Sequence, residues 1–302
     1  MPDPATDWKW PDFDEPELTD RLLLDGESFH QLWVRIARQM PARDYSPEAF
    51  ETGTGYPWPR PEGSFVLDQG EDRLLNDLDM SSRQALLEEF TGEESGRTPM
   101  LAIGSNASPE GLWRKFAHFE EAGNRTVLAV TGRLEDFDVG ASAELALYGA
   151  LPATIFPSPG TRVNTTAVWL TDAQLKQLAW AEIPYWLGRL DTRFEAEDGV
   201  AELGFGGFDR ALVFVNRFGA FAPHGEPVAL AAIAAENRRV RALEQVELLQ
   251  LAADLAYGEG MTAVDLVRLA YEEPDRVGPL VAEAMRSNSI PFESERWTPL
   301  PG

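Results

Sequence analysis

The chain has 302 residues, with 50 acidic residues against 26 basic ones and a formal net charge of -24. Hydrophobic residues make up 44% and charged residues 25%, which is typical of a globular protein with one large domain or two smaller ones. So acidic a surface repels phosphates, which makes nucleic acid and anionic membranes poor partners. The chain has no Cys, and this excludes disulfides, thiol nucleophiles and Cys-ligated metal sites.

The remaining composition gives no sign of a metal centre or a membrane segment. The three His residues share no metal-binding spacing, no apolar run approaches the ~20 residues of a membrane helix, and the acidic N-terminus is unlike a signal peptide. We therefore expect a soluble, cytoplasmic protein that needs no metal or cofactor. The preference for Arg over Lys fits either a bacterium with a high-GC genome or a salt-adapted organism.

The first hundred residues divide into an irregular acidic arm, residues 1–25, and a mostly helical extension, residues 26–97. Apolar residues at three- and four-residue steps predict a helix over 29–40, and a second helix is expected over 81–90. Between them, alternating Pro residues in the segment 56–61 predict an extended loop packed by its aromatic side chains. Residues 92–99 form the clearest linker.

From residue 98 to 225 the pattern changes to short strands separated by turns. The expected strands are 100–103, 126–131, 154–156, 163–170 and 211–216, with helices after the first and the fourth. Pro and Gly between the third and fourth strands predict a hairpin turn. The fold class that results is α+β, a small mixed β-barrel with flanking helices and with helical extensions at both ends.

The C-terminal segment, residues 226–302, reads as helical. A long helix is expected over 228–257, a second after the N-cap Thr262, and a third from Pro274. The apolar stripe of the long helix would serve either as a homo-oligomer interface or for packing on the protein's own body. Its members are Val240, Leu243, Val246 and Leu249.

The first candidate site lies where the strand ending at Ile103 runs into Gly104, Ser105 and Asn106 and then into a helix capped by Ser108. Backbone N–H groups at such a junction point outward together, and the helix N-terminus favours negative charge. The loop therefore suits a carboxylate or a developing oxyanion. An ordinary capped connection between strand and helix is the alternative.

The second candidate is Glu182, at the end of a helix that starts at Thr171 with a capping box to Gln174. Glu182 continues the apolar stripe of that helix, so its carboxylate is directed toward the core among neighbours that offer little solvation. This setting suits a general acid/base. Alternatively, Glu182 turns to water or pairs with Arg189 or Arg193.

Taken in order, three segments resemble the gamma-glutamylcyclotransferase-like superfamily, in an extended bacterial branch. They are Ile-Gly-Ser-Asn at 103–106, Pro-Ala-Thr-Ile-Phe-Pro-Ser-Pro-Gly at 152–160 and Leu-Ala-Trp-Ala-Glu-Ile-Pro-Tyr at 178–185. In that family a strand leads into Tyr-Gly-Ser-Asn, a central strand reads Ala-Thr-x-x-Pro-x-Pro-Gly, and a later helix ends in the catalytic Glu. The resemblance covers about residues 98–220, with Ile103 standing where the family usually has Tyr.

The resemblance implies an enzyme that cleaves a γ-glutamyl amide to 5-oxoproline and a free amine by intramolecular aminolysis, a transferase or lyase type of reaction without a cofactor. It implies Glu182 as the catalytic residue. The substrate-binding residues would be Ile103, Gly104, Ser105, Asn106 and Tyr185. The alternative is a noncatalytic module that binds a small carboxylate or a protein, which Ile103 in place of Tyr favours, whereas the retained Glu182 favours the enzyme.

Overall fold

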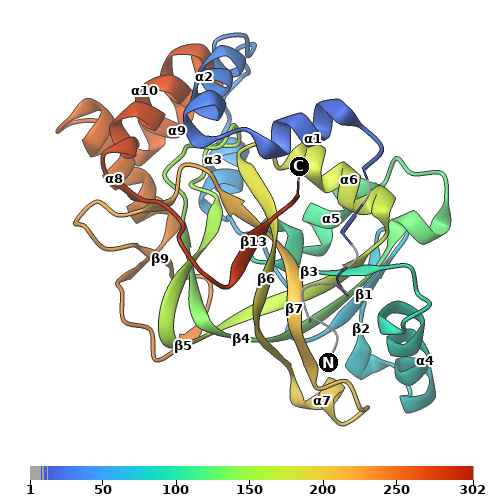
Figure 1. Ribbon diagram of the computed structural model, residues 1–302. Helices are drawn as coiled ribbons and strands as arrows, with labels where there is room; N and C mark the ends of the chain where they lie inside the picture. Colours follow the sequence, from blue (N-terminus) through green and yellow to red (C-terminus); the bar gives the residue numbers. More distant parts are fainter. Residues whose placement is uncertain (1–7, 9, 12, 302) are drawn as a thin grey trace.

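The centre of the protein is a closed five-stranded β-barrel, seen in a computed structural model that describes residues 8, 10, 11 and 13–301 (Figure 1). The barrel strands, in the order in which they pair around the ring, are β3 (Thr98–Ala102), β7 (Gly207–Asn216), β6 (Tyr185–Ala196), β4 (Thr126–Ala141) and β5 (Ala153–Leu170), which returns to β3. β3 and β7 are parallel, and the other neighbours in the ring are antiparallel. The predicted α+β class with a small mixed barrel is confirmed.

Helices and short strands surround this barrel. The helices are α1 (Pro16–Leu23), α2 (Gly26–Ala37), α3 (Pro47–Thr54), α4 (Met80–Thr91), α5 (Pro109–Phe116), α6 (Asp172–Ala181), α7 (Asp198–Ala201), α8 (Gln245–Tyr257), α9 (Ala263–Glu272) and α10 (Pro274–Arg286), with 3-10 turns η1 (Leu75–Asp77), η2 (Ser105–Ala107) and η3 (Ala122–Arg125). The outer strands are β1 (Phe65–Asp68), β2 (Glu71–Leu74), β8 (Ala220–Phe221), β9 (Ala229–Leu230), β10 (Ala235–Glu236), β11 (Ala242–Leu243), β12 (Ser289–Ile290) and β13 (Trp297–Pro299). Within the described residues, no helix combines the length and the apolar character needed to cross a membrane.

β4 and β5 form the longest pairing of the barrel, and it runs through the predicted hairpin turn. The two strands expected at 154–156 and 163–170 are one strand, so the turn prediction was wrong. The Pro/Gly stretch lies at an irregularity where the register shifts between Glu135 and Phe137. There Asp136 has a φ of 64°, and its carboxylate accepts a hydrogen bond from the N–H of Gly160 at 2.9 Å. The bulge absorbs the residues that would otherwise break the strand.

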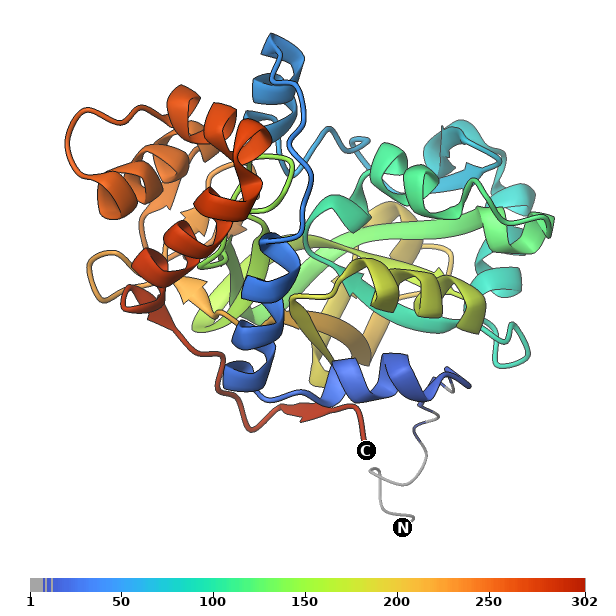
Figure 2. The same ribbon diagram turned by 90° about the horizontal axis from the view of Figure 1, so that it is seen from above.

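Two groups of helices cover different parts of the barrel (Figure 2). α5 and α6 bury Leu112, Phe116, Leu175 and Leu178 against one face of the sheet. α6 starts as predicted, with the complete capping box of Thr171 and Gln174. α8, α9 and α10 pack on another part together with α2, and the predicted starts of α9 and α10 are confirmed. α6 packs beside α5, and its C-cap residue, Glu182, lies next to the loop that follows β3.

The predicted long helix over 228–257 was wrong, because its first half forms β9, β10 and β11. β9 pairs with β4 and β11, and β10 pairs with β5. These pairings override the helix propensity of the Ala-rich run. Val240 and Leu243 precede α8, while Leu249 is buried in the protein's own core. Leu243 and Leu249 therefore serve for internal packing, whereas Val246 on α8 is 45% exposed. A homo-oligomer through the C-terminal helices stays a prediction.

The sheet continues across the expected domain boundaries, which stay predictions. β1, β10 and β13 all lie outside residues 98–225, yet they pair with β4, β5 and β6 respectively. Part of the expected irregular arm forms α1, which starts at Pro16 and buries Leu18 and Leu22 on one face. Residues 1–7, 9 and 12 of that arm lie outside the described residues.

Candidate active site

The loop after β3 and the end of α6 are in direct contact. Asn106 lies in η2, where its side-chain Nδ2 donates a hydrogen bond to Oε1 of Glu182 at 3.0 Å. Glu182 caps the C-terminus of α6, where its backbone N–H donates to the carbonyl of Leu178 at 2.8 Å. Two segments that are 76 residues apart in the sequence therefore meet at one carboxylate.

Lys115 of α5 completes this contact. Its Nζ lies 2.7 Å from Oε1 of Glu182 and 2.5 Å from Oδ1 of Asn106. The side chains of Lys115 and Glu182 are 19% and 16% exposed, so the ion pair is mostly but not fully shielded from solvent. A primary ammonium, a carboxylate and an amide thus form one hydrogen-bonded group, which we call the Glu182 triad.

The expected alternative partners of Glu182 were wrong. Arg189 pairs with Asp191 at 2.9 Å, and Arg193 pairs with Asp209 at 3.4 Å. Both arginines lie on β6, which carries them away from the end of α6. Lys115 was missed because it lies 67 residues earlier in the chain, and only the packing of α5 beside α6 brings it to Glu182.

The second segment of the sequence trio joins the same region through two tyrosines. The backbone N–H of Ala153, at the start of β5, donates to the hydroxyl oxygen of Tyr56 at 2.9 Å. The hydroxyl of Tyr185 donates to the carbonyl of Ala153, also at 2.9 Å. Burial raises the pKa of both tyrosines above the ordinary value, so both hydroxyls stay protonated at neutral pH.

Gly104 is required by the position of Tyr56. A Cβ at Gly104 would overlap the hydroxyl oxygen of Tyr56 and come within 3.2 Å of the Cβ of Ala153. In this structure the group that approaches the main chain at Gly104 is the Tyr56 hydroxyl. Ile103 is buried in the barrel core. The Tyr56 hydroxyl therefore lies beside the loop, although residue 103 is Ile and has no hydroxyl.

A second carboxyl, Glu144, lies near Glu182 in the connection between β4 and β5. It is 2% exposed, and burial raises its pKa to about 8, with a smaller opposing effect of the Asn216 side chain and a further increase from the charge of Glu182. Among the described residues, Glu144 Oε2 and Asn216 Nδ2 are buried without a hydrogen-bond partner. No sequence motif marks Glu144, since its neighbours are Ala and Leu.

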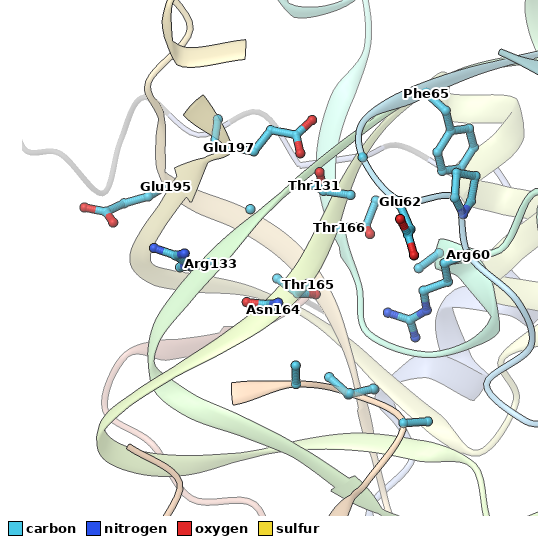
Figure 3. Close-up of a pocket in the computed structure, with 18 residues that line it drawn as sticks. Arg60, Glu62, Phe65, Thr131, Arg133, Asn164, Thr165, Thr166, Glu195 and Glu197 are labelled. Carbon is cyan, nitrogen blue, oxygen red and sulfur yellow. The ribbon is translucent and has the colours of Figure 1, made fainter. Parts of the chain in front are cut away.

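A pocket of about 750 Å³ borders the loop at Ala107 (Figure 3). Its polar lining residues include Arg60, Glu62, Thr131, Asn164, Thr165 and Thr166. None of the six predicted site residues lines it. Arg60 connects the two sites, because its Nη2 donates to the carbonyls of Ile103 and Gly104, at 3.2 Å each. Within the described residues, no group of three His, Asp or Glu side chains could hold a metal ion.

Comparison with known proteins gives a weak likeness of fold. No protein-family model and no curated protein sequence matches the chain. A solved structure described as a gamma-glutamyl cyclotransferase is similar, with a TM-score of 0.30 and 17% sequence identity. The match covers 40% of this chain and 66% of that one, just under two thirds of its length. This is a weak relationship of fold, and it says nothing of the reaction.

Proposed function

We propose that the protein is a cyclotransferase-like enzyme that cleaves a γ-glutamyl amide to 5-oxoproline and a free amine. The observation that carries the proposal is the contact between Asn106 and Glu182. It joins a carboxylate that would act as base and acid to a loop that would donate hydrogen bonds to a developing oxyanion, which is the pairing that an acyl transfer needs. The Tyr56 and Tyr185 contacts to Ala153 support it, because they bring the middle segment of the sequence trio to the same place.

Glu182 would act as the base and then as the acid. The α-ammonium of the γ-glutamyl unit gives a proton to Glu182, and the resulting amine attacks the γ-carbonyl carbon. A new C–N bond closes the five-membered ring, and the bond to the leaving amine breaks as Glu182 returns a proton to that nitrogen. Overall the attacking nitrogen loses two protons and the leaving amine gains two, so the reaction has no net proton uptake.

The loop after β3 would bind the negative charge of the substrate and of the intermediate. The side-chain amide of Asn106 lies beside Glu182, and the main chain of Ser105 lies beside the Tyr56 hydroxyl. Both groups could donate hydrogen bonds to the substrate. Tyr56 would supply the hydroxyl that position 103 lacks. Because the attack is intramolecular, holding the glutamyl chain curled contributes much of the rate.

Lys115 occupies the place that a substrate ammonium would take. Its Nζ contacts the carboxylate of Glu182 and the amide oxygen of Asn106, which are the acceptors that an α-ammonium requires. Substrate binding in this proposal displaces the Lys115 ammonium toward solvent. The partial exposure of both side chains is compatible with such a movement.

The same observation favours a second candidate, a noncatalytic module that binds a small carboxylate. If Lys115 holds Glu182 permanently, the carboxylate serves to fix α5 and α6 to the loop. The loop would then bind an anion without turnover. The two candidates differ in whether Glu182 is needed for product formation.

The test is the release of 5-oxoproline, measured by mass spectrometry, from a panel of γ-glutamyl dipeptides, glutathione and γ-glutamyl amines. We expect wild-type protein to release it and Glu182→Gln to be slower by on the order of a hundredfold or more, because Gln keeps the size but cannot accept the proton. Glu259→Gln, in the exposed loop after α8, is the matched control and should behave as wild type. Equal turnover by Glu182→Gln would exclude Glu182 as the base.

Absence of product from every substrate would count against the enzyme. A thermal-shift measurement with 5-oxoproline and glutamate would then test the second candidate. Stabilisation by either ligand that persists in Arg60→Gln, which removes the cation of the neighbouring pocket, would support a binding module at the loop.

A further inference from the structure

The pocket that borders the loop at Ala107 contains a cation without a counter-ion among the described residues. Arg60 lines the pocket, and Figure 3 shows its guanidinium group directed into it. Within the described residues, Arg60 forms no ion pair, and its Nε is enclosed without an acceptor. The two carbonyls that Nη2 contacts supply dipoles but no charge. A shielded charge without a partner is costly, and burial lowers the pKa of Arg60 to about 10.

Other charged groups around the pocket already have partners. Glu195 pairs with Arg162, and Arg133 lies 3.5 Å from Glu236. Glu197 accepts the backbone N–H of Ser64 at 2.7 Å. These groups leave Arg60 as the cation whose charge no described side chain balances at ion-pair distance.

Glu62 is the complementary group. It is exposed, it lines the same pocket, and no described residue forms an ion pair with it. In Figure 3 its carboxylate and the Arg60 guanidinium both face the interior of the pocket, opposite Thr165 and Asn164. A ligand that bears one negative and one positive group would match both.

We propose that this pocket binds a small zwitterion of the amino-acid class, with its carboxylate on Arg60 and its ammonium group on Glu62. Thr165, Thr166 and Asn164 provide neutral hydrogen-bonding groups in the lining of the pocket. An isolated carboxylate would bind less well, because the net charge of -24 opposes any added anion. The site is separate from the Glu182 triad and does not depend on the proposed reaction.

Ligand-observed NMR tests this proposal, with glycine, acetate, methylamine and inorganic phosphate as separate probes. We expect glycine to bind several-fold more tightly than acetate or phosphate, and methylamine not to bind. Arg60→Gln should abolish the binding of glycine and acetate, whereas Arg60→Lys, which keeps the charge, should retain part of it. Arg241→Gln, an exposed arginine outside the pocket, is the control and should bind glycine as wild type does.

Glu62→Gln keeps the test decisive if Arg60→Gln fails to fold. This exposed substitution should lower glycine binding to the level of acetate and leave acetate binding unchanged. Equal binding of glycine by wild type and Glu62→Gln, or phosphate binding as tight as glycine, would overturn the proposed ligand class.

Glu182→Gln separates the two sites. Unchanged glycine binding by this variant would support a pocket independent of Glu182, whether or not the protein turns over γ-glutamyl amides. Loss of glycine binding in Glu182→Gln would place the ligand at the Glu182 triad and overturn the proposal.

Discussion

We expect Glu144 to make the stability of the protein depend on pH. Burial raises its pKa from 4.5 to about 8, so between these values the folded protein holds a proton that the unfolded chain has released. Because of this group, the free energy of unfolding of the protein falls as pH rises from about 4.5 to about 8, by up to about 1.4 kcal/mol per pH unit. Glu144→Gln cannot ionise, so we expect its stability to decline less between about pH 5 and pH 8.

Urea unfolding across this pH range measures the effect. Glu259→Gln, exposed in the loop after α8, should follow the wild-type profile. A Glu144→Gln profile parallel to that of wild type would show that Glu144 ionises alike in the folded and unfolded protein.

Lys115 tests how the Glu182 triad works. Lys115→Met removes the ammonium but keeps most of the side-chain volume, so a substrate ammonium no longer competes for Glu182. We expect KM for a γ-glutamyl substrate to fall several-fold while kcat is retained. Lys176→Met removes the ion pair with Glu15 and serves as the control. A fall in kcat with unchanged KM would mean that Lys115 assists the chemistry instead of blocking the site.

Among the elements, local signals located several helix starts and the five expected strands, which overlap β3, β4, β5 and β7, but they missed β6 and the strands before α8. The capping boxes at Thr171 and Thr262 and the start at Pro274 are determined by neighbouring residues, and the structure has them. β6 escaped prediction because its charged residues interrupt the alternation that marks a half-buried strand. The Ala-rich run before α8 forms strands only because β4 and β5 offer it pairing partners.

The candidate site shows the same division between local and long-range information. Asn106 and Glu182 were found because each lies at a recognisable junction of strand and helix or at a helix end. Tyr56, Lys115 and Glu144 come from a Pro-rich loop, a helix flank and an Ala/Leu-rich connection. Nothing local marks them, and only the packing of distant segments gives them a place beside the loop.

The contact between the Pro-rich loop and the loop after β3 can be tested at Gly104. Gly104→Ala would force the Tyr56 hydroxyl away from Ala153, so we expect a loss of stability of about 1 to 3 kcal/mol, typical of overpacking. Replacing Tyr56 by Phe removes the obstructing oxygen. In thermal unfolding, the additional cost of Gly104→Ala should therefore be smaller in a Tyr56→Phe background than in wild type. Equal costs in the two backgrounds would contradict the contact.

At the scale of the whole molecule, the barrel depends on segments from both ends of the chain. One hydrophobic core includes Tyr56 and Leu75, which precede residues 98–225 in the chain, and Leu248 and Val281, which follow them. We expect the fragment 98–225 alone to lose these contacts and the pairing of β1, β10 and β13. It should aggregate or show no cooperative transition in circular dichroism, whereas the full chain unfolds in one step. Cooperative unfolding of the fragment would establish residues 98–225 as an independent domain.

In the proposed function, Glu182, Asn106 and the loop after β3 form the site for the γ-glutamyl group. A crystal structure of the protein with 5-oxoproline, the product of the proposed reaction, tests it most directly. We expect the ring beside Ser105 and Asn106, within hydrogen-bonding distance of Glu182, with the Lys115 ammonium displaced from its present position. A ligand bound only in the Arg60 pocket, with the Glu182 triad intact, would contradict it.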